Sequence, residues 1–202
     1  MSRFLFTTTT RIGSSTIRLR HKGLWLAEGD ANKITDMLAQ ARQMLSSTIT
    51  AVYNGAANEE FARTYFKTVP TAAEWKRIHA NLELIFGGLN TDVTLKLGGD
   101  GADGYVRASV IWTGPGRCRL SHAGHTIHVS KKSILADAER GIKIIIHEAS
   151  HKYANTEDYD VRGYRLVDDR DWVADGLTKA EALNNADSYA HFAYRQGRSM
   201  GA

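Results

Sequence analysis

One short segment constrains the fold of this chain more than any other. Residues 144–151 read Ile-Ile-Ile-His-Glu-Ala-Ser-His, inside a pattern that predicts a helix over about residues 136–153. Residues four apart lie on one helix face, so His147 and His151 are expected to point the same way. The isoleucines are expected to dock the helix on the core and to exclude water behind the histidines. The chain must therefore place one face of a largely buried helix against a polar site.

The two imidazoles indicate a metal site. A pair of neutral histidines and a third ligand suit a tetrahedral zinc ion that keeps one position open. Glu148 lies about 100° further around the helix, where it can reach a metal-bound water without displacing it. Zinc lowers the pKa of such a water, and the glutamate accepts its proton. We therefore expect one Zn²⁺ on His147 and His151, with Glu148 as the general base.

The third ligand is expected just downstream of this helix. The segment reads Asn155-Thr156-Glu157-Asp158-Tyr159-Asp160 and is rich in carboxylates. A chain that leaves the helix near residue 154 must turn back over the metal within a few residues. From this spacing, Glu157, Asp158 and Asp160 are all within reach, and at least two of them are expected to be solvated loop residues.

Taken together, these motifs resemble the aspzincin zinc peptidases, the group of deuterolysin and the lysine-specific metallo-endopeptidases. The resemblance rests on the HEASH segment, on Thr156-Glu157-Asp158, which reproduces a Thr-x-Asp motif, and on Asn185-Ala186-Asp187. It covers about residues 58–194 and leaves the N-terminal 30 residues outside. It implies an α+β, zincin-like metallopeptidase domain with N-terminal strands, a helical layer, a small antiparallel sheet and the HExxH helix.

Carried over position by position, the resemblance implies roles for individual residues. His147 and His151 match the two zinc ligands, and Glu148 matches the catalytic glutamate. Asp158 best matches the aspartate that serves as third ligand. Asn155 departs from the family pattern, which usually has Gly at this position.

A tyrosine that stabilises the oxyanion is not placed by a motif. The family has a Tyr-Gly pair shortly after the aspartate, whereas this chain continues Tyr159-Asp160-Val161-Arg162-Gly163-Tyr164. Tyr164 is our first candidate for this role and Tyr159 the second. Asp160 stays a rival of Asp158 as metal ligand.

Asp187 has two interpretations. The resemblance places it near the active site as a substrate-binding residue, whereas a helix aspartate beside Asn185 can also hydrogen-bond a nearby group. In the lysine-specific branch a second carboxylate follows three residues later, and here that position is Ala190. The resemblance therefore does not imply strict lysine specificity.

Composition and charge exclude some other classes of protein. The net charge is +4 and the pI about 9.2, and the densest basic stretch, residues 18–22, alternates with Ile17 and Leu19 as in a strand. A nucleic-acid-binding protein typically carries a denser basic stripe, so we expect no nucleic-acid partner. The single cysteine, Cys118, allows no intrachain disulfide. No run approaches the roughly 18 apolar residues of a membrane span.

Secondary structure is predicted from periodicity and turn residues. We expect residues 1–30 to form a β-rich extension and residues 31–202 to form one compact metallopeptidase domain. The predicted strands are 4–10, 16–20, 24–27, 93–97, 105–112 and 125–129. The predicted helices are 30–51, 58–66, 71–86, 136–153 and 179–194.

The sequence thus predicts a zinc-dependent endopeptidase that acts on protein or peptide substrates. The short apolar run at the N-terminus is not a Sec signal peptide. The resemblance to bacterial effectors and toxins then suggests delivery by a dedicated secretion machine. The alternative is a non-catalytic, zinc-stabilised binding protein, in which a fourth protein ligand closes the metal site. The oligomeric state is not predicted.

Overall fold

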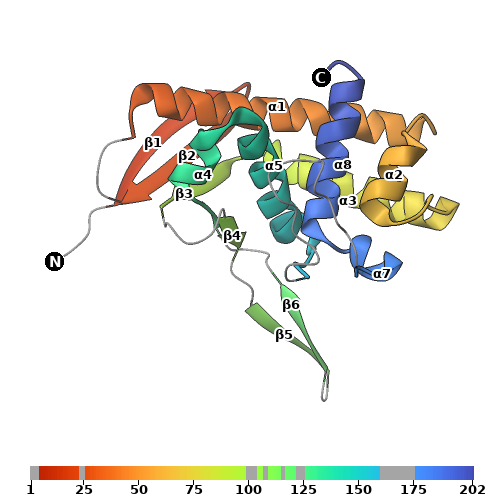
Figure 1. The fold of residues 1–202 in the computed structure, drawn as a ribbon. Helices are drawn as coiled ribbons and strands as arrows, with labels where there is room; N and C mark the ends of the chain where they lie inside the picture. The colour runs from red at the N-terminus through yellow and green to blue at the C-terminus, as the bar shows by residue number, and fades with distance from the viewer. Residues whose placement is uncertain are drawn as a thin grey trace.

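The computed structural model describes residues 5–22, 26–98, 104–106, 109–114, 117–121, 126–159 and 176–202 (Figure 1). Its strands are β1 (Leu5–Ile12), β2 (Ser15–Lys22), β3 (Val93–Leu97), β4 (Gly104–Val106), β5 (Ser109–Gly114), β6 (Arg117–Ser121) and β7 (Ile127–Val129). Its helices are α1 (Glu28–Tyr53), α2 (Glu59–Phe66), α3 (Ala72–Leu89), α4 (Lys131–Ala136), α5 (Ala138–Ala149), the π-helical turn η1 (Ser150–Ala154), α7 (Lys179–Ala182) and α8 (Ala186–Ser199).

The main sheet has five strands in the order β1-β2-β3-β7-β4. Its edge pairs, β1 with β2 and β4 with β7, are antiparallel, whereas β2, β3 and β7 run parallel. The predicted α+β class is confirmed, but the sheet is mixed rather than antiparallel. The reason is connectivity, because α1 to α3 lie between β2 and β3 and supply the long crossover that parallel pairing needs.

The N-terminal strands belong to this sheet. β2 lies between β1 and β3, and its Ile17 and Leu19 side chains are fully buried. The predicted strand at 24–27 lies partly outside the described residues, and Leu26 and Ala27 lead directly into α1. The predicted division of the chain after residue 30 stays a prediction.

A separate two-stranded hairpin, β5-β6, follows β4. In Figure 1 it projects away from the rest of the ribbon, below β4. The sequence predicts one strand over residues 105–112 and none over 117–121. The structure instead has β4 in the main sheet and β5 paired with β6.

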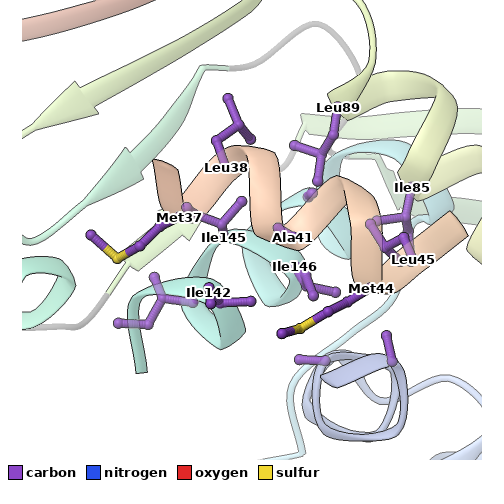
Figure 2. Close-up of a cluster of buried hydrophobic side chains, with 14 of the residues drawn as sticks. Met37, Leu38, Ala41, Met44, Leu45, Ile85, Leu89, Ile142, Ile145 and Ile146 are labelled. Atoms are coloured by element: carbon purple, nitrogen blue, oxygen red, sulfur yellow. The ribbon is translucent and has the colours of Figure 1, made fainter. Parts of the chain in front are cut away.

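The core lies between the sheet and the helices. α1 packs against α3, α5 and α8, and its apolar side chains contact the isoleucines of α5 (Figure 2). Ile145 and Ile146 are fully buried, as the sequence predicts for the isoleucines that precede His147. The labelled cluster contains Met37, Leu38, Ala41, Met44, Leu45, Ile85, Leu89, Ile142, Ile145 and Ile146.

Two helices begin or end at residues other than those predicted, one because of packing and one because of a helix cap. The helix predicted over residues 71–86 stops before Gly87 and Gly88, yet α3 continues through both glycines to Leu89. A Cβ atom on Gly88 would lie 2.3 Å from the ring of Tyr153, so this glycine allows η1 to approach α3 closely. The helix predicted to begin at residue 136 begins at Ala138 instead. Asp137 has an extended backbone, which separates α4 from α5, and its side chain caps α5.

The last predicted helix, 179–194, is two helices, α7 and α8. They are separated at residues 183–185, where Asn185 forms a bridge with Glu157. None of the helices in the described ranges combines the length and apolar content needed to cross a bilayer.

Candidate metal centre

The histidines lie where an α-helix changes into a π-helical turn. Asp137 caps α5 by accepting a hydrogen bond from the Arg140 amide at 2.8 Å, and the helix carries His147 near its end. His151 lies one turn later in η1, and π-helical turns are frequent at functional sites. The turn ends at Asn155, whose φ of 53° and ψ of 40° are left-handed. Glycine and asparagine tolerate this conformation best, so Asn155 can take the position where the peptidases that the sequence resembles usually have Gly.

Three donor atoms converge beside these helices. The Nε2 atoms of His147 and His151 are 3.0 Å apart, and Asp158 Oδ1 lies 3.4 Å from the former and 3.3 Å from the latter. A tetrahedral zinc ion with bonds of about 2.0–2.2 Å holds its ligand atoms about 3.3–3.6 Å apart. Both distances to Asp158 lie in this range, and the distance between the two Nε2 atoms is 0.3 Å below it, so a small separation of the rings would fit a zinc ion.

The hydrogen bonds at the Nδ1 atom of each ring orient both Nε2 lone pairs toward the space between the three donor atoms. His151 Nδ1 lies 2.8 Å from the Thr156 carbonyl oxygen, which can only accept, so Nδ1 carries the proton. His147 Nδ1 lies 2.6 Å from the Asp187 carboxylate, which likewise accepts when ionised. In the neutral rings the two lone pairs and the Asp158 carboxylate then repel one another, and a shared cation removes this repulsion.

The segment that carries Asp158 is tied to α8 rather than left free. The Glu157 amide donates to the Asn184 carbonyl at 2.8 Å, and the Ala186 amide donates to the Glu157 carbonyl at 3.0 Å. The buried hydroxyl groups of Ser150 and Thr156 are 2.7 Å apart. These bonds fix the turn that returns the chain over the histidines.

Glu148 lies beside the cluster with its side chain almost fully buried. Its Oε1 is 3.9 Å from His147 Nε2, and its Oε2 has no hydrogen-bond partner among the described residues. An unpaired buried carboxylate oxygen is costly unless a cation or a water meets it. Burial raises the pKa of Glu148 to about 7, although His147 and His151 pull it down. A carboxylate with this pKa is suited to exchange a proton near neutral pH.

The charges around His147 favour a cation. Burial alone would lower the pKa of this ring, but the charge and the hydrogen bond of Asp187 raise it to about 10, with further help from Glu148 and Asp158. The same carboxylates that hold a proton on the ring would hold a metal ion in its place.

The comparisons with known proteins agree with this geometry at the level of the fold. A solved zinc peptidase from Grifola frondosa superposes with a TM-score of 0.60 and 14% identity, over 84% of this chain and 97% of that one. The chain shares its fold with a zinc peptidase. No protein-family model matches the sequence, and no curated protein matches it either. The predicted α+β fold of a zinc peptidase is thus confirmed, and at this identity the likeness concerns the fold alone.

Of the three predicted candidates for the third ligand, the structure brings Asp158 into the cluster. Glu157 is exposed and, among the described residues, the cluster contains only the two histidines and Asp158. Asp160 and Tyr164 lie outside the described residues. The hydroxyl of Tyr159 accepts a hydrogen bond from the Asn184 side chain at 3.2 Å.

Two further polar residues of α8 have clear places. Asp187 is buried against His147, so it contacts the candidate metal centre, and its predicted contact with substrate stays a prediction. His191 is also buried and stacks on Tyr65, with ring centroids 6.0 Å apart. Its surroundings are therefore those of a core residue. The side chain of Cys118 lies outside the described part.

Sequence reasoning missed the residues that position the site from a distance. Thr156 supplies the carbonyl that orients His151, and Ser150 holds this threonine. Gly104 contacts the site as well, because a Cβ atom there would lie 2.4 Å from Glu148 Oε1. No local pattern signals this contact, because residues 104 and 148 meet only through the fold.

Proposed function

We propose that this protein is a zinc-dependent endopeptidase, with zinc on His147, His151 and Asp158. The observation that carries the proposal is the convergence of three donor atoms within 4.8 Å of one another beside a buried glutamate. The shared fold with a zinc peptidase supports the same reaction class. The proposed substrates are accordingly proteins or peptides.

In the proposed reaction, the chemistry that zinc supplies when bound is Lewis acidity, which activates water and the scissile carbonyl near neutral pH. Glu148 accepts the proton of the attacking water and passes it to the leaving amine. Asp187 keeps the His147 ring in the tautomer that presents Nε2 to the metal, and the Thr156 carbonyl does the same for His151.

The alternative, a zinc-stabilised binding protein, has less support. A structural zinc site is closed by four protein ligands. Among the described residues the cluster offers three donors, with the carboxylate of Glu148 beside it at 3.9 Å from His147. This arrangement favours an open fourth position. Secretion as an effector or toxin stays a prediction from the family resemblance.

The decisive experiment compares two glutamine variants. Glu148→Gln removes the base but none of the three donors, so we expect casein cleavage to fall by about 10² to 10⁴-fold. Zinc content, measured by elemental analysis of the dialysed protein, should stay at one ion per chain. Glu157→Gln is the matched control, because its exposed side chain lies outside the cluster, and it should keep full activity. A fully active Glu148→Gln protein would refute the mechanism.

A further inference from the structure

The outward face of the main sheet carries an unusual row of side chains. Residues paired across neighbouring strands project from the same face. The pairs Thr7–Arg20, Arg20–Lys96, Lys96–His128 and His128–Tyr105 are continuous, so one row crosses all five strands. The opposite face carries the buried residues Ile17, Leu19, Val93, Leu95, Leu97, Ile127 and Val129.

This outward face is strongly basic. Arg18 lies in the row next to that of Arg20 and Lys96, and Arg11 lies in the row after it. Arg20 and Arg11 are exposed. Among the described residues of the face the one carboxylate is Asp92, which already pairs with Arg18 at 3.3 Å. The other three cations have no described carboxylate within ion-pairing distance.

Protection of sheet edges does not account for these charges. Lysine and arginine often lie on edge strands, where they prevent pairing with other chains. Here Arg18, Arg20 and Lys96 lie on β2 and β3, which are interior strands. Like charges on neighbouring strands repel each other, so a face of this kind loses stability unless an anion neutralises it.

The row leads to the metal site. At its far end Tyr105, 46% exposed, stacks on His128 with ring centroids 4.3 Å apart and an angle of 16°. The preceding residue, Gly104, faces the other way and contacts the Glu148 carboxylate. The basic face and the glutamate therefore lie on opposite sides of one edge strand, β4.

We propose that this face binds an acidic segment of the protein substrate while the chain on one side of that segment is cleaved. The inference rests on the proposed endopeptidase function and names its substrate class. Four steps between strands about 4.8 Å apart span about 19 Å, and an extended peptide covers this with about six residues. The surface thus selects proteins that carry a short run of Asp and Glu near the cleavage site, and its contribution should fall as salt is added.

The test uses reporter peptides that share one cleavable sequence. One reporter carries six glutamates on the N-terminal side, one carries them on the C-terminal side, and a neutral one carries serine and glycine. The Arg20→Glu/Lys96→Glu protein should lose about tenfold in kcat/KM on at least one acidic reporter and none on the neutral one. The charge-matched control is Lys33→Glu/Lys76→Glu, because both lysines are exposed on α1 and α3, and it should retain wild-type values.

Binding is measured separately from cleavage. Fluorescence anisotropy of a labelled octaglutamate peptide gives its affinity for the Glu148→Gln protein. Adding Arg20→Glu/Lys96→Glu to this protein should weaken the affinity about tenfold. Adding the control pair should leave the affinity unchanged. If no reporter is cut by any of these proteins, the endopeptidase proposal fails. The anisotropy measurement alone then tests whether the basic face binds an acidic peptide. Equal losses of kcat/KM or of peptide affinity in the Arg20→Glu/Lys96→Glu protein and in the Lys33→Glu/Lys76→Glu control would overturn the inference. So would tighter binding of an eight-nucleotide single-stranded DNA, which would assign the face to nucleic acid.

Discussion

His147 is held at both ring nitrogens by groups from different parts of the chain. Its Nε2 faces His151 and Asp158, while Asp187, forty residues away, meets its Nδ1 at 2.6 Å. Carboxylates in this position fix the ring and increase its basicity toward a metal. The geometry therefore fits Asp187 as a positioning residue for the proposed metal site.

Asp187→Asn tests this role, because it preserves the shape of the side chain and removes its charge. We expect zinc affinity to fall by about 10- to 100-fold, measured by competition with a fluorescent chelator. The control is Asp92→Asn, which changes an exposed carboxylate just before β3 and should bind zinc as the wild type does. Unchanged affinity in Asp187→Asn would contradict the assignment and leave substrate binding as its predicted role.

Gly104 contributes by having no side chain. A Cβ atom there would lie 2.4 Å from Glu148 Oε1 and 2.7 Å from its carboxyl carbon, so either β4 or the carboxylate must move. We expect Gly104→Ala to lower kcat at least tenfold, since a displaced base loses its alignment with water. Zinc content should not change. Gly87→Ala, where a Cβ meets nothing within 4 Å, should leave kcat unaltered, and equal rates in the two variants would show that the contact is unimportant.

These residues also show how far the sequence alone can define the site. His147, Glu148 and His151 lie within five residues, so helical periodicity predicts their common face. Asp158 required the family resemblance, because spacing alone also allowed Glu157. Gly104 reaches the site only through the strand pairing of β4, and no local pattern encodes that pairing.

At the scale of elements, the helices cross where side chains are smallest. α8 passes α1 at Gly197, where a Cβ atom would lie 2.7 Å from Met44 Cα and 2.9 Å from its carbonyl oxygen. Backbone atoms cannot rotate away as a side chain can. We expect Gly197→Ala to lower the free energy of unfolding by about 1–3 kcal/mol, even though alanine favours helices.

Gly87→Ala is the matched change in open space, and it should raise the free energy of unfolding by about 0.5–1 kcal/mol. Urea denaturation followed by circular dichroism measures both values. The two glycines differ in what surrounds them and not in chemistry. A stabilised Gly197→Ala protein would therefore mean that α1 and α8 do not pack as closely as described.

Local signals predict most elements but not their partners. The capping box of Thr71 and Glu74 begins α3 at the start predicted for the helix 71–86, and Asn58 caps α2 at the start predicted for the helix 58–66. The predicted strand 93–97 has the observed bounds, yet nothing in its residues indicates parallel pairing with β2 and β7. Pairing depends on the long connection through α1, α2 and α3, so it is decided by packing rather than by the strand.

At the scale of the whole molecule, the candidate metal site forms where separate regions meet. α5 and η1 carry the histidines, the following segment carries Asp158, α8 carries Asp187, and β4 closes over Glu148. The sheet therefore contributes to the site through its edge. Loss of its N-terminal strands should weaken both the core and the site.

A chain that begins at residue 27 tests this dependence, together with the predicted division of the chain after residue 30. It lacks β1 and β2, so β3 becomes an edge with unpaired backbone groups, and Val93 and Leu95 lose their neighbours Ile17 and Leu19. We expect little soluble protein, no cooperative thermal transition by circular dichroism, and no stoichiometric zinc. A chain that begins at residue 5 keeps both strands and should melt as the full chain does. If the shorter chain melts cooperatively and binds zinc, residues 1–30 are a separable extension, and the sheet needs no contribution from them to hold the metal site.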